Sequence, residues 1–451
     1  MDWWKELWLN EGFASFMEYL AVDQLFPEFN IWQEFITDTF TSALGLDALH
    51  NSHPIEVPVH HPSEIEEIFD RVSYEKGASV IRMLYNYIGN EDFQQGMHNY
   101  LTKWAYKNAV TEDLWDSLEE ASKKPVRSIM STWTRQMGYP VINVTSRQDG
   151  SNRVLTLTQE KFSIDGVLSE KDQQAKWLVP VNIITQANPK PVKVLLENRS
   201  QEVILEGIEP NEWVKLNPGM TSFFRVNYPS EMLELFLPAI TDKSLSGIDR
   251  LNIQNDLYAL MRSGKVSSDR ILKLMEAYQL EDQYVVWDSI IDCLASFNRV
   301  LAYTDFQEVF QLYACKLLAK IYSKIGSKPV PGEDHQVALL RSRVFGLLVS
   351  CRDPQILQEA KSQFESHLSK LTQIPADLRS SIYRAVASDC DEKTFESFFQ
   401  LYRESDLQEE KNRLVCSLGA SKDPARLQRV IDFAMSVSDP STSFGCLPKL
   451  L

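Results

Sequence analysis

The sequence predicts a multidomain, mainly α-helical protein in which one small β-sandwich separates two helical regions. Its 451 residues favour several domains, at roughly 100 to 200 residues per domain. Apolar residues recur with the helical period of about 3.6 towards both ends and with the strand period of about 2 between them. Apolar residues make up 44% and charged residues 24% of the chain, which is typical of a folded protein with sizeable cores.

The first region, residues 1–140, is expected to be helical. Gly89 is placed to end one of its helices, and Thr111 is placed to cap another before two acidic residues. The Gly-Tyr-Pro sequence at 138–140 is expected to end the last helix. An apolar stripe predicts an amphipathic helix near the N-terminus: Leu9, Phe13, Phe16 and Leu20.

The second region, residues 141–229, changes to the strand period. Leu155 and Leu157 alternate with threonines, and similar short runs follow, separated by Asn, Gly and Pro residues. Half a dozen or more short strands in this space predict a small β-sandwich.

The third region, residues 230–451, returns to the helical period. Asp353-Pro354 and Asp423-Pro424 lie at expected helix starts, with Ser388-Asp389-Cys390-Asp391 between them, which indicates a weak repeat of about 35 residues. Aspartate suits the cap and proline the first helical position. We therefore expect a HEAT-like or armadillo-like α-solenoid. Because solenoids usually end in a polar capping repeat, the apolar Leu450-Leu451 favours an incomplete one.

Charge and composition disfavour several classes of partner. The chain has 46 basic and 62 acidic residues, and a net charge of -16 repels nucleic acids and anionic membranes. It has no apolar run of the roughly 18 to 20 residues that a membrane span needs, and its N-terminus lacks the signal-peptide pattern. The six cysteines form no C-x-x-C pair and are expected to be reduced. The sequence predicts a cytoplasmic protein that binds neither nucleic acid nor membrane.

One acidic residue stands in an apolar, aromatic segment. Residues Trp3–Phe16 read WWKELWLNEGFASF, and from spacing alone Glu11 is a partly exposed glutamate in the first turn of a helix. The segment resembles the W-W-x-D-L-W-L-N-E-G-F-A sequence of the gluzincin zinc aminopeptidases. Four later segments continue the resemblance: SHPIEV (52–57), HPSEIEEIFDRVSYEKGASVIRML (61–84), TEDLWDSLEEASKKPV (111–126) and STWTRQMGYPVINV (131–144).

This resemblance implies a fold and an activity. Residues 1–140 would be the C-terminal helical part of a thermolysin-like catalytic domain, followed by the family's β-sandwich and helical domains. The activity would be the removal of N-terminal residues from peptides with a free N-terminus, through water activated by one Zn²⁺ ion.

The resemblance also implies roles for individual residues. Glu11 corresponds to the third zinc ligand, and Tyr74, in SYEKG, corresponds to the tyrosine that stabilises the oxyanion. Without the resemblance, Tyr74 would be an ordinary helix aromatic. Glu18 is a candidate partner for orienting a zinc ligand, although a solvated helix face is an equal alternative. Glu6 is a second such candidate and stands where the family has Asp. The resemblance assigns no substrate-binding residue.

Part of the family's site is missing from the sequence. None of the seven histidines lies in an H-E-x-x-H motif, and the G-A-M-E-N segment that binds the substrate amine is absent. The family's spacing would place H-E-x-x-H just before Met1. Adjacent His60 and His61 are poor substitutes, because neighbouring side chains point in different directions. We therefore expect an N-terminally truncated chain that supplies one zinc ligand and is inactive by itself.

A second hypothesis remains open. The chain would then be a genuine short protein, a non-catalytic helical-repeat interaction protein derived from an aminopeptidase, with unidentified partners. The nucleotide sequence just 5′ of the Met1 codon would distinguish the two hypotheses.

Overall fold

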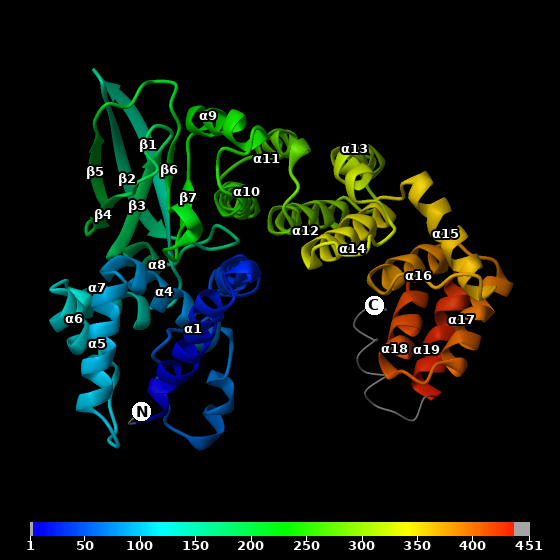
Figure 1. The fold of residues 1–451 in the computed structure, drawn as a ribbon, viewed down its shortest axis with the longest axis horizontal. Helices are drawn as coiled ribbons and strands as arrows, with labels where there is room; N and C mark the ends of the chain where they lie inside the picture. The colour runs from blue at the N-terminus through cyan, green and yellow to red at the C-terminus, as the bar shows by residue number, and fades with distance from the viewer. Residues whose placement is uncertain (1–2, 437–451) are drawn as a thin grey trace. The chain divides into compact units, whose positions relative to one another are not determined.

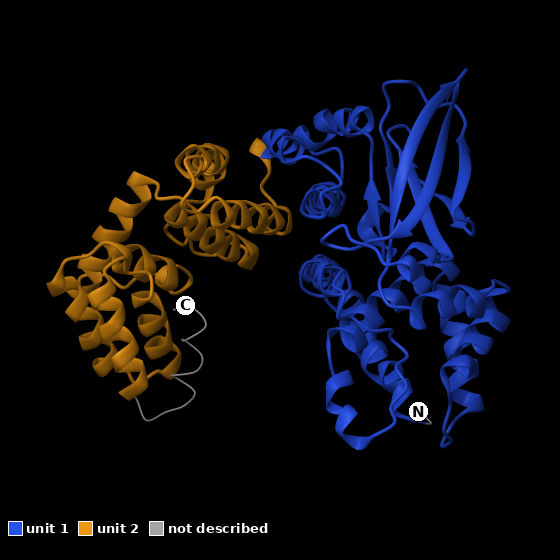
Figure 2. Ribbon diagram, turned by 180° about the vertical axis from the view of Figure 1, so that it is seen from behind, with its two compact units in different colours: residues 1–278 blue, residues 279–451 orange. Residues whose placement is uncertain are grey.

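The computed structural model describes residues 3–436, and the chain divides into two compact units, residues 1–278 and 279–451. Unit 1 contains N-terminal helices, two β-sheets and three further helices, whereas the described part of unit 2 is helical (Figures 1 and 2). The structure confirms the prediction of a mainly helical protein with one small β region. Leu450-Leu451, from which an incomplete solenoid is expected, lie outside the described residues.

The N-terminal part of unit 1 is built from α-helices joined by short π- and 3₁₀-helices. Gly89, at a positive φ of 99°, ends the fourth α-helix as predicted. The α-helices are α1 (Leu7–Leu25), α2 (Ile31–Glu34), α3 (Thr41–Leu46), α4 (Gly77–Ile88), α5 (Asn90–Lys103), α6 (Thr111–Ser122) and α7 (Val126–Thr134). The short helices are η1 (Trp4–Glu6), η2 (Pro27–Phe29), η3 (Phe35–Phe40), η4 (Pro62–Glu64), η5 (Glu66–Ile68) and η6 (Val72–Lys76), of which η3 and η6 are π-helices.

Helices α1 and α4 pack backbone to backbone at a pair of glycines. A Cβ atom added to Gly12 would lie 3.1 Å from both Cα and the carbonyl carbon of Gly77. A Cβ atom added to Gly77 would lie 3.3 Å from Cα of Gly12. Any larger residue at Gly12 would therefore push the helices apart. The crossing also brings the first turns of α1 against η6, which leads directly into α4.

A buried ion pair fixes the other end of η6. Nζ of Lys76 lies 2.8 Å from Oδ2 of Asp47, and both side chains are almost completely buried. Oδ1 of Asp47 accepts hydrogen bonds from the Ser52 hydroxyl at 2.7 Å and from the Gly138 amide at 3.0 Å. Nζ of Lys76 also donates to the Gly138 carbonyl at 3.2 Å. Since each charge has its partners, η6 is anchored to two segments far away in sequence.

The β region of unit 1 forms two sheets, which make up the predicted small β-sandwich (Figure 1). The four-stranded sheet has the order β5-β2-β1-β7, in which β1 and β7 are parallel and the other pairs antiparallel. The three-stranded sheet has the order β4-β3-β6 and is antiparallel. The strands are β1 (Pro140–Asp149), β2 (Asn152–Lys161), β3 (Val179–Thr185), β4 (Val192–Leu196), β5 (Ser200–Leu205), β6 (Val214–Leu216) and β7 (Arg225–Asn227), and the short helices α8 (Glu170–Gln174) and η7 (Pro218–Met220) lie between them.

Three helices that follow the sandwich belong to unit 1: α9 (Ser230–Thr241), α10 (Gly247–Arg262) and α11 (Ser268–Met275). Buried polar contacts hold α10 to the strands. Asp256 pairs with Arg225 at 2.9 Å and accepts the Val226 amide at 3.0 Å. Nζ of Lys215 donates to Asn252 at 2.6 Å. The compact units therefore divide at 278/279, while the predicted domain boundary at 229/230 stays a prediction.

Unit 2 is a stack of helices. Helices α12, α14, α16 and α18 form a row in which each contacts the next, and the remaining helices pack against members of that row (Figure 1). The helices are α12 (Tyr284–Val300), α13 (Gln307–Ile325), α14 (His335–Ser350), α15 (Pro354–Leu368), α16 (Arg379–Ser388), α17 (Glu392–Glu404), α18 (Gln408–Leu418) and α19 (Pro424–Ser436), with short helices η8 (Glu276–Leu280) at the unit boundary and η9 (Ala376–Leu378) before α16.

The predicted aspartate caps recur in this stack. Asp353 accepts the amides of Gln355 and Ile356 at 3.0 and 3.1 Å and so caps α15. Asp391 accepts the Thr394 amide at 2.8 Å at the start of α17, and Asp423 accepts the Ala425 amide at 2.9 Å at the start of α19. The same aspartate cap thus begins α15, α17 and α19, and the stacked helices confirm the solenoid prediction.

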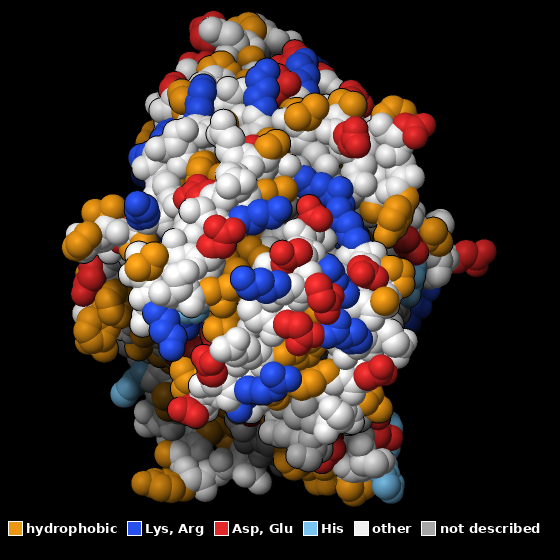
Figure 3. All heavy atoms as spheres, turned by 90° about the vertical axis from the view of Figure 1, so that its right-hand side faces the viewer, with side chains coloured by type: hydrophobic (Ala, Val, Ile, Leu, Met, Phe, Trp, Pro, Cys, Tyr) orange, Lys and Arg blue, Asp and Glu red, His pale blue; other side chains and the backbone are white. Residues whose placement is uncertain are grey.

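The sequence also led to expectations about surface charge, membrane-spanning helices and the redox state of the cysteines. On the face shown in Figure 3, basic and acidic side chains are interspersed. No helix between residues 3 and 436 is both long and apolar enough to cross a membrane. The prediction of reduced cysteines is wrong for Cys416, which is disulfide-bonded. Among residues 3–436, four cysteines carry free thiols: Cys293, Cys315, Cys351 and Cys390.

The glycine crossing leads to a stability prediction. Replacing Gly12 by alanine should lower the free energy of unfolding of unit 1 by about 1–3 kcal/mol, because the methyl group meets the backbone of α4. Gly45, also helical, is the matched control, since a Cβ atom there meets nothing within 4 Å. Gly45→Ala should stabilise the protein by about 0.5–1 kcal/mol. Urea denaturation followed by tryptophan fluorescence measures both, and equal effects of the two substitutions would contradict the close packing.

Candidate active site

Glu11 and Tyr74 are brought together from different elements. Glu11 lies in the second turn of α1 and Tyr74 in the middle of η6, and both side chains are half-buried. The Tyr74 hydroxyl lies close enough to the Glu11 carboxylate for the two groups to interact. Partial burial, together with the adjacent Glu11 carboxylate and its negative charge, raises the pKa of Tyr74 above its ordinary value. The hydroxyl therefore keeps its proton at neutral pH and can act as a hydrogen-bond donor.

The backbone that carries Tyr74 is held by an aspartate before it. Oδ1 of Asp70 accepts the amides of Val72 and Ser73 at 3.0 and 3.1 Å, and the Asp70 carbonyl accepts the Tyr74 amide at 3.1 Å. Asp70 thus satisfies amide groups that a helix leaves free at its N-terminus. The resulting turn is a π-helix, a local distortion that is frequent at functional sites.

His53 supports Asp70 from a neighbouring loop. Its Nε2 lies 2.8 Å from Oδ2 of Asp70, and its Nδ1 lies 2.7 Å from the Pro54 carbonyl oxygen. A carbonyl and an ionised carboxylate can only accept, so this geometry requires both ring nitrogens to donate, as they do in the charged imidazolium. Burial opposes the charge, but the Asp70 and Pro54 contacts outweigh it and raise the pKa of His53. The pKa of Asp70 is lowered, because the hydrogen bonds and the charge of His53 outweigh burial.

Glu6 contacts the start of α6. The Glu6 side chain is completely buried, and its carboxylate accepts the amide of Thr111 at 2.9 Å as well as the Thr111 hydroxyl. Nζ of Lys5 lies 3.3 Å from the other carboxylate oxygen. The prediction of Thr111 as a cap is wrong, because the cap of α6 is Val110 and Thr111 is the first helical residue. Glu6 therefore anchors the start of α6.

Glu18 lies two turns beyond Glu11 on α1 and is exposed. A role for Glu18 or Glu6 in orienting a zinc ligand stays a prediction. His60 and His61 are also exposed, and His61 caps η4 by accepting the Ser63 amide at 3.2 Å. Their amides both donate to Glu64. These histidines serve a local turn.

A zinc site would need several donor groups gathered around one point. Between residues 3 and 436, no three His, Cys, Asp or Glu side chains are gathered as they would be around a metal ion. Zinc is held by several ligands in tetrahedral geometry. Glu11 alone does not meet that requirement, so the residues present do not form a complete zinc site.

An apolar groove of about 660 Å³ lies beside the N-terminal half of α1. Leu9, Phe13 and Leu20, three residues of the predicted stripe, line it together with side chains of α4 and α5. Phe16, the fourth, is fully buried against Tyr85 and Phe93. The stripe is thus partly packed and partly open to this groove.

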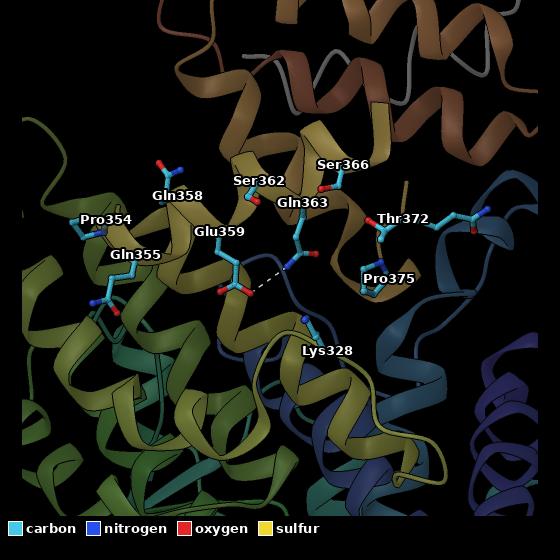
Figure 4. Close-up of a pocket in the computed structure, with 11 residues that line it drawn as sticks. Lys328, Pro354, Gln355, Gln358, Glu359, Ser362, Gln363, Ser366, Thr372 and Pro375 are labelled. Carbon is cyan, nitrogen blue, oxygen red and sulfur yellow. Dashed lines mark hydrogen bonds between the residues drawn. The ribbon is translucent and has the colours of Figure 1, made fainter. Parts of the chain in front are cut away.

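A second, polar cavity of about 1010 Å³ lies within unit 2 (Figure 4). Most of its lining comes from α15, and Lys328, Thr372, Gln373 and Pro375 complete it. Glu359 accepts a hydrogen bond from Gln363 at 3.2 Å and another from the Tyr322 hydroxyl at 2.7 Å. This cavity contains neither Glu11 nor Tyr74.

Comparison with known proteins identifies the family. A model of the peptidase family M1 domain matches residues 1–133, and a model of the ERAP1-like C-terminal domain matches residues 213–444. The chain belongs to peptidase family M1. The M1 match covers Glu11 and Tyr74, and the expected helical part of a catalytic domain and the α-solenoid are confirmed.

Curated M1 relatives align with nearly the whole chain. It is 38% identical over 438 residues to a puromycin-sensitive aminopeptidase of Caenorhabditis elegans, covering 96% of this chain and 46% of that protein. It is 38% identical over 464 residues to aminopeptidase M1 of Arabidopsis thaliana, covering 97% and 51%. It is 32% identical over 457 residues to glutamyl aminopeptidase of Sus scrofa, covering 98% and 46%. The chain therefore spans about half the length of the curated relatives it matches. The sequence segments had pointed to the cytosolic puromycin-sensitive aminopeptidase within the family, and a protein of that name is among these relatives.

The sequence did not predict the residues that position Glu11 and Tyr74. Gly12 follows Glu11 directly, and Gly77 ends SYEKG, yet neither indicated a helix crossing by itself. His53 and Asp70 both lie in segments that carried the resemblance. Their pairing joins two loops, which local periodicity does not report.

The His53–Asp70 pair leads to a pH prediction. The folded pKa of His53 is raised above its ordinary 6.5, so its stabilising contribution is complete below pH 6.5 and is lost as the pH rises through the raised value. The folded pKa of Asp70 is lowered below 3.8, so its contribution is lost only as the pH falls through that lowered value. The charge of Lys76 opposes that of His53.

We therefore expect the stability difference between the wild-type chain and His53→Gln to be largest in mildly acidic solution and to shrink as the pH rises. Thermal midpoints between about pH 5 and pH 9 measure this difference. His98→Gln, at an exposed position on α5, is the matched control and should show a small difference that does not follow this profile. A His53→Gln difference that grows with pH would contradict the ion pair.

Proposed function

We propose that this chain supplies the Glu11–Tyr74 side of the active site of a zinc aminopeptidase, an enzyme that removes N-terminal residues from peptides. The observation that carries the proposal is that these two side chains, from separate elements, lie close enough to interact in a chain of family M1. Their juxtaposition is what a metal ligand and an adjacent oxyanion donor require. The relatives described above are all named as aminopeptidases, which supports the same reaction class.

Each of the two residues would have a separate role. The Glu11 carboxylate would be the anionic oxygen ligand of the zinc ion, with the remaining ligands and the base supplied by an H-E-x-x-H segment. Zinc in such a site activates water for attack on a peptide carbonyl. The Tyr74 hydroxyl would donate a hydrogen bond to the oxygen of the attacked carbonyl as negative charge develops on it. One such donor contributes about 10²- to 10³-fold in rate.

The raised pKa of Tyr74 supports this role, because only the protonated hydroxyl can donate. The substrates would be peptides with a free N-terminus, and the site of action would be the cytoplasm. Neither nucleic acid nor a membrane is part of the proposal.

The second candidate is a non-catalytic helical-repeat interaction protein. It is favoured by one observation, that the described residues gather no three metal-ligating side chains. The two candidates differ in what happens when the H-E-x-x-H segment is supplied, since only the first predicts an active enzyme.

One prediction of this proposal concerns the zinc content of the chain of 451 residues. Because the described residues bring one expected ligand and no group of three, we expect well below one zinc ion per chain after desalting, and no hydrolysis of aminoacyl amides. Elemental analysis and a fluorogenic aminoacyl amide provide the measurements. Glu11→Ala should change neither result. Near-stoichiometric zinc that disappears in Glu11→Ala would show that the chain completes the site by itself.

A further prediction concerns the chain joined to the H-E-x-x-H and G-A-M-E-N segments of an M1 relative. In this extended protein, Tyr74→Phe should retain zinc while kcat falls by about 10²-fold or more and KM changes little, because the hydroxyl acts on the transition state. Tyr87→Phe, on the next helix, is the control and should leave kcat nearly unchanged. Normal turnover in Tyr74→Phe would remove the proposed role, and an inactive extended protein that binds no zinc would favour the second candidate.

A further inference from the structure

Two free thiols of unit 2 lie against each other although they are far apart in sequence. Cys315 is in the middle of α13, and Cys351 is the residue that ends α14. Sγ of Cys315 lies 4.0 Å from the carbonyl oxygen of Cys351. The two thiol groups are also close enough to affect each other's pKa. Helices α13 and α14 pack together, so this contact belongs to the helix interface.

The two thiols differ in accessibility. The Cys351 side chain is only 4% exposed, whereas Cys315 is half-buried. A small oxidant in solution can therefore reach the Cys315 sulfur, and the Cys351 sulfur lies next to it in the interior. An accessible thiol that reacts first, next to a second thiol that resolves the product, is the arrangement found in redox-sensitive cysteine pairs.

The contact also distinguishes the thiols electrostatically. When Cys315 ionises, its sulfur accepts a hydrogen bond from the Cys351 thiol, and this lowers the pKa of Cys315 although burial and the nearby Asp353 carboxylate oppose it. The same hydrogen bond, together with burial, raises the pKa of Cys351. Cys315 is thus the thiol that ionises first, and thiolates are the nucleophilic form.

The other described free thiols lack this arrangement. Cys390 is half-buried like Cys315, but its sulfur contacts the Ala387 carbonyl and the Arg426 guanidinium at 3.9 Å each. Burial raises the pKa of Cys390 despite that positive charge. Cys293 is fully buried. Cys390 is therefore a matched control for the reactivity of Cys315.

We propose that Cys315 and Cys351 form a redox-active dithiol that closes to an intramolecular disulfide when the protein meets a peroxide. The Cys315 thiolate attacks one peroxide oxygen, the O–O bond breaks, and with one proton taken up the products are a sulfenic acid and water. The Cys351 sulfur then attacks the Cys315 sulfur, the S–O bond breaks, and a second water leaves with the Cys351 proton. In total, two thiols and one hydrogen peroxide give one disulfide and two waters.

The disulfide would join α13 covalently to the corner between α14 and α15. Asp353, two residues after Cys351, caps α15, and Pro354 and Gln355 line the polar cavity of unit 2. Oxidation would thus restrain the helix corner from which that cavity is built. A reducing thiol would reverse it by exchange.

Peptide mapping of the oxidised chain tests the proposal directly. Trypsin, which cuts after Arg299, Lys316, Arg343 and Arg352, releases Cys315 in peptide 300–316 and Cys351 in peptide 344–352. The reduced chain is treated with one equivalent of hydrogen peroxide, free thiols are blocked, and the digest is analysed without reductant. We expect the two peptides as one linked species, two hydrogens lighter than their sum. Cys390→Ser should retain this species, and Cys315→Ser or Cys351→Ser should lose it.

Alkylation rates provide a second readout that needs no oxidation. At neutral pH, iodoacetamide should modify Cys315 about tenfold faster than Cys390. Cys351→Ser keeps a hydrogen-bond donor and should largely preserve the Cys315 rate, whereas Cys351→Ala should reduce it towards that of Cys390. Sulfinic acid at Cys315 without a linked peptide, or equal alkylation of Cys315 and Cys390 in the wild-type chain, would overturn the proposal.

Discussion

The close approach of α1 and α4 at Gly12 and Gly77 is the contact on which the candidate site depends. Glu11 precedes one glycine directly, and Tyr74 precedes the other by three residues. Since neither glycine has a side chain, the two backbones meet, and this contact fixes the spacing of the backbone segments that carry Glu11 and Tyr74. Such a restraint suits a site in which a ligand and a hydrogen-bond donor must hold their geometry.

The turn that carries Tyr74 is held at both ends by charged pairs. Before it, Asp70 caps the turn and is itself paired with His53. After it, the buried Lys76 pairs with Asp47. Buried charges are unfavourable unless paired and hydrogen-bonded, and Lys76 and Asp47 are stabilised by each other and by the distant Gly138 backbone. The π-helical turn is thus specified by long-range contacts and not by its own helix propensity.

Unit 2 is held together by local contacts between neighbouring helices. An aspartate caps α15, α17 and α19 in the same way, and each helix packs chiefly against its neighbours in the stack. Stability in such a stack is spread over many similar interfaces. A chemical change at one corner, such as the contact between Cys315 and Cys351, therefore acts on a local interface and on the cavity beside it.

The sequence by itself determined the types of element, their order and the two residues of the candidate site. Periodicity distinguished helices from strands. Gly89 predicted a helix end and Asp353 a helix start. The motifs around Glu11 and Tyr74 indicated the family. These signals are local, because each depends on residues within one or two turns of each other.

Only the tertiary structure decided which of these local elements meet. It placed Gly12 against Gly77, turned Thr111 from an expected cap into the partner of a buried Glu6, and joined α10 to the sandwich through Asp256 so that the compact unit ends at 278. Each of these contacts joins segments tens of residues apart. Their partners are selected by packing and by the pairing of buried charges, and neither leaves a periodic trace in the sequence.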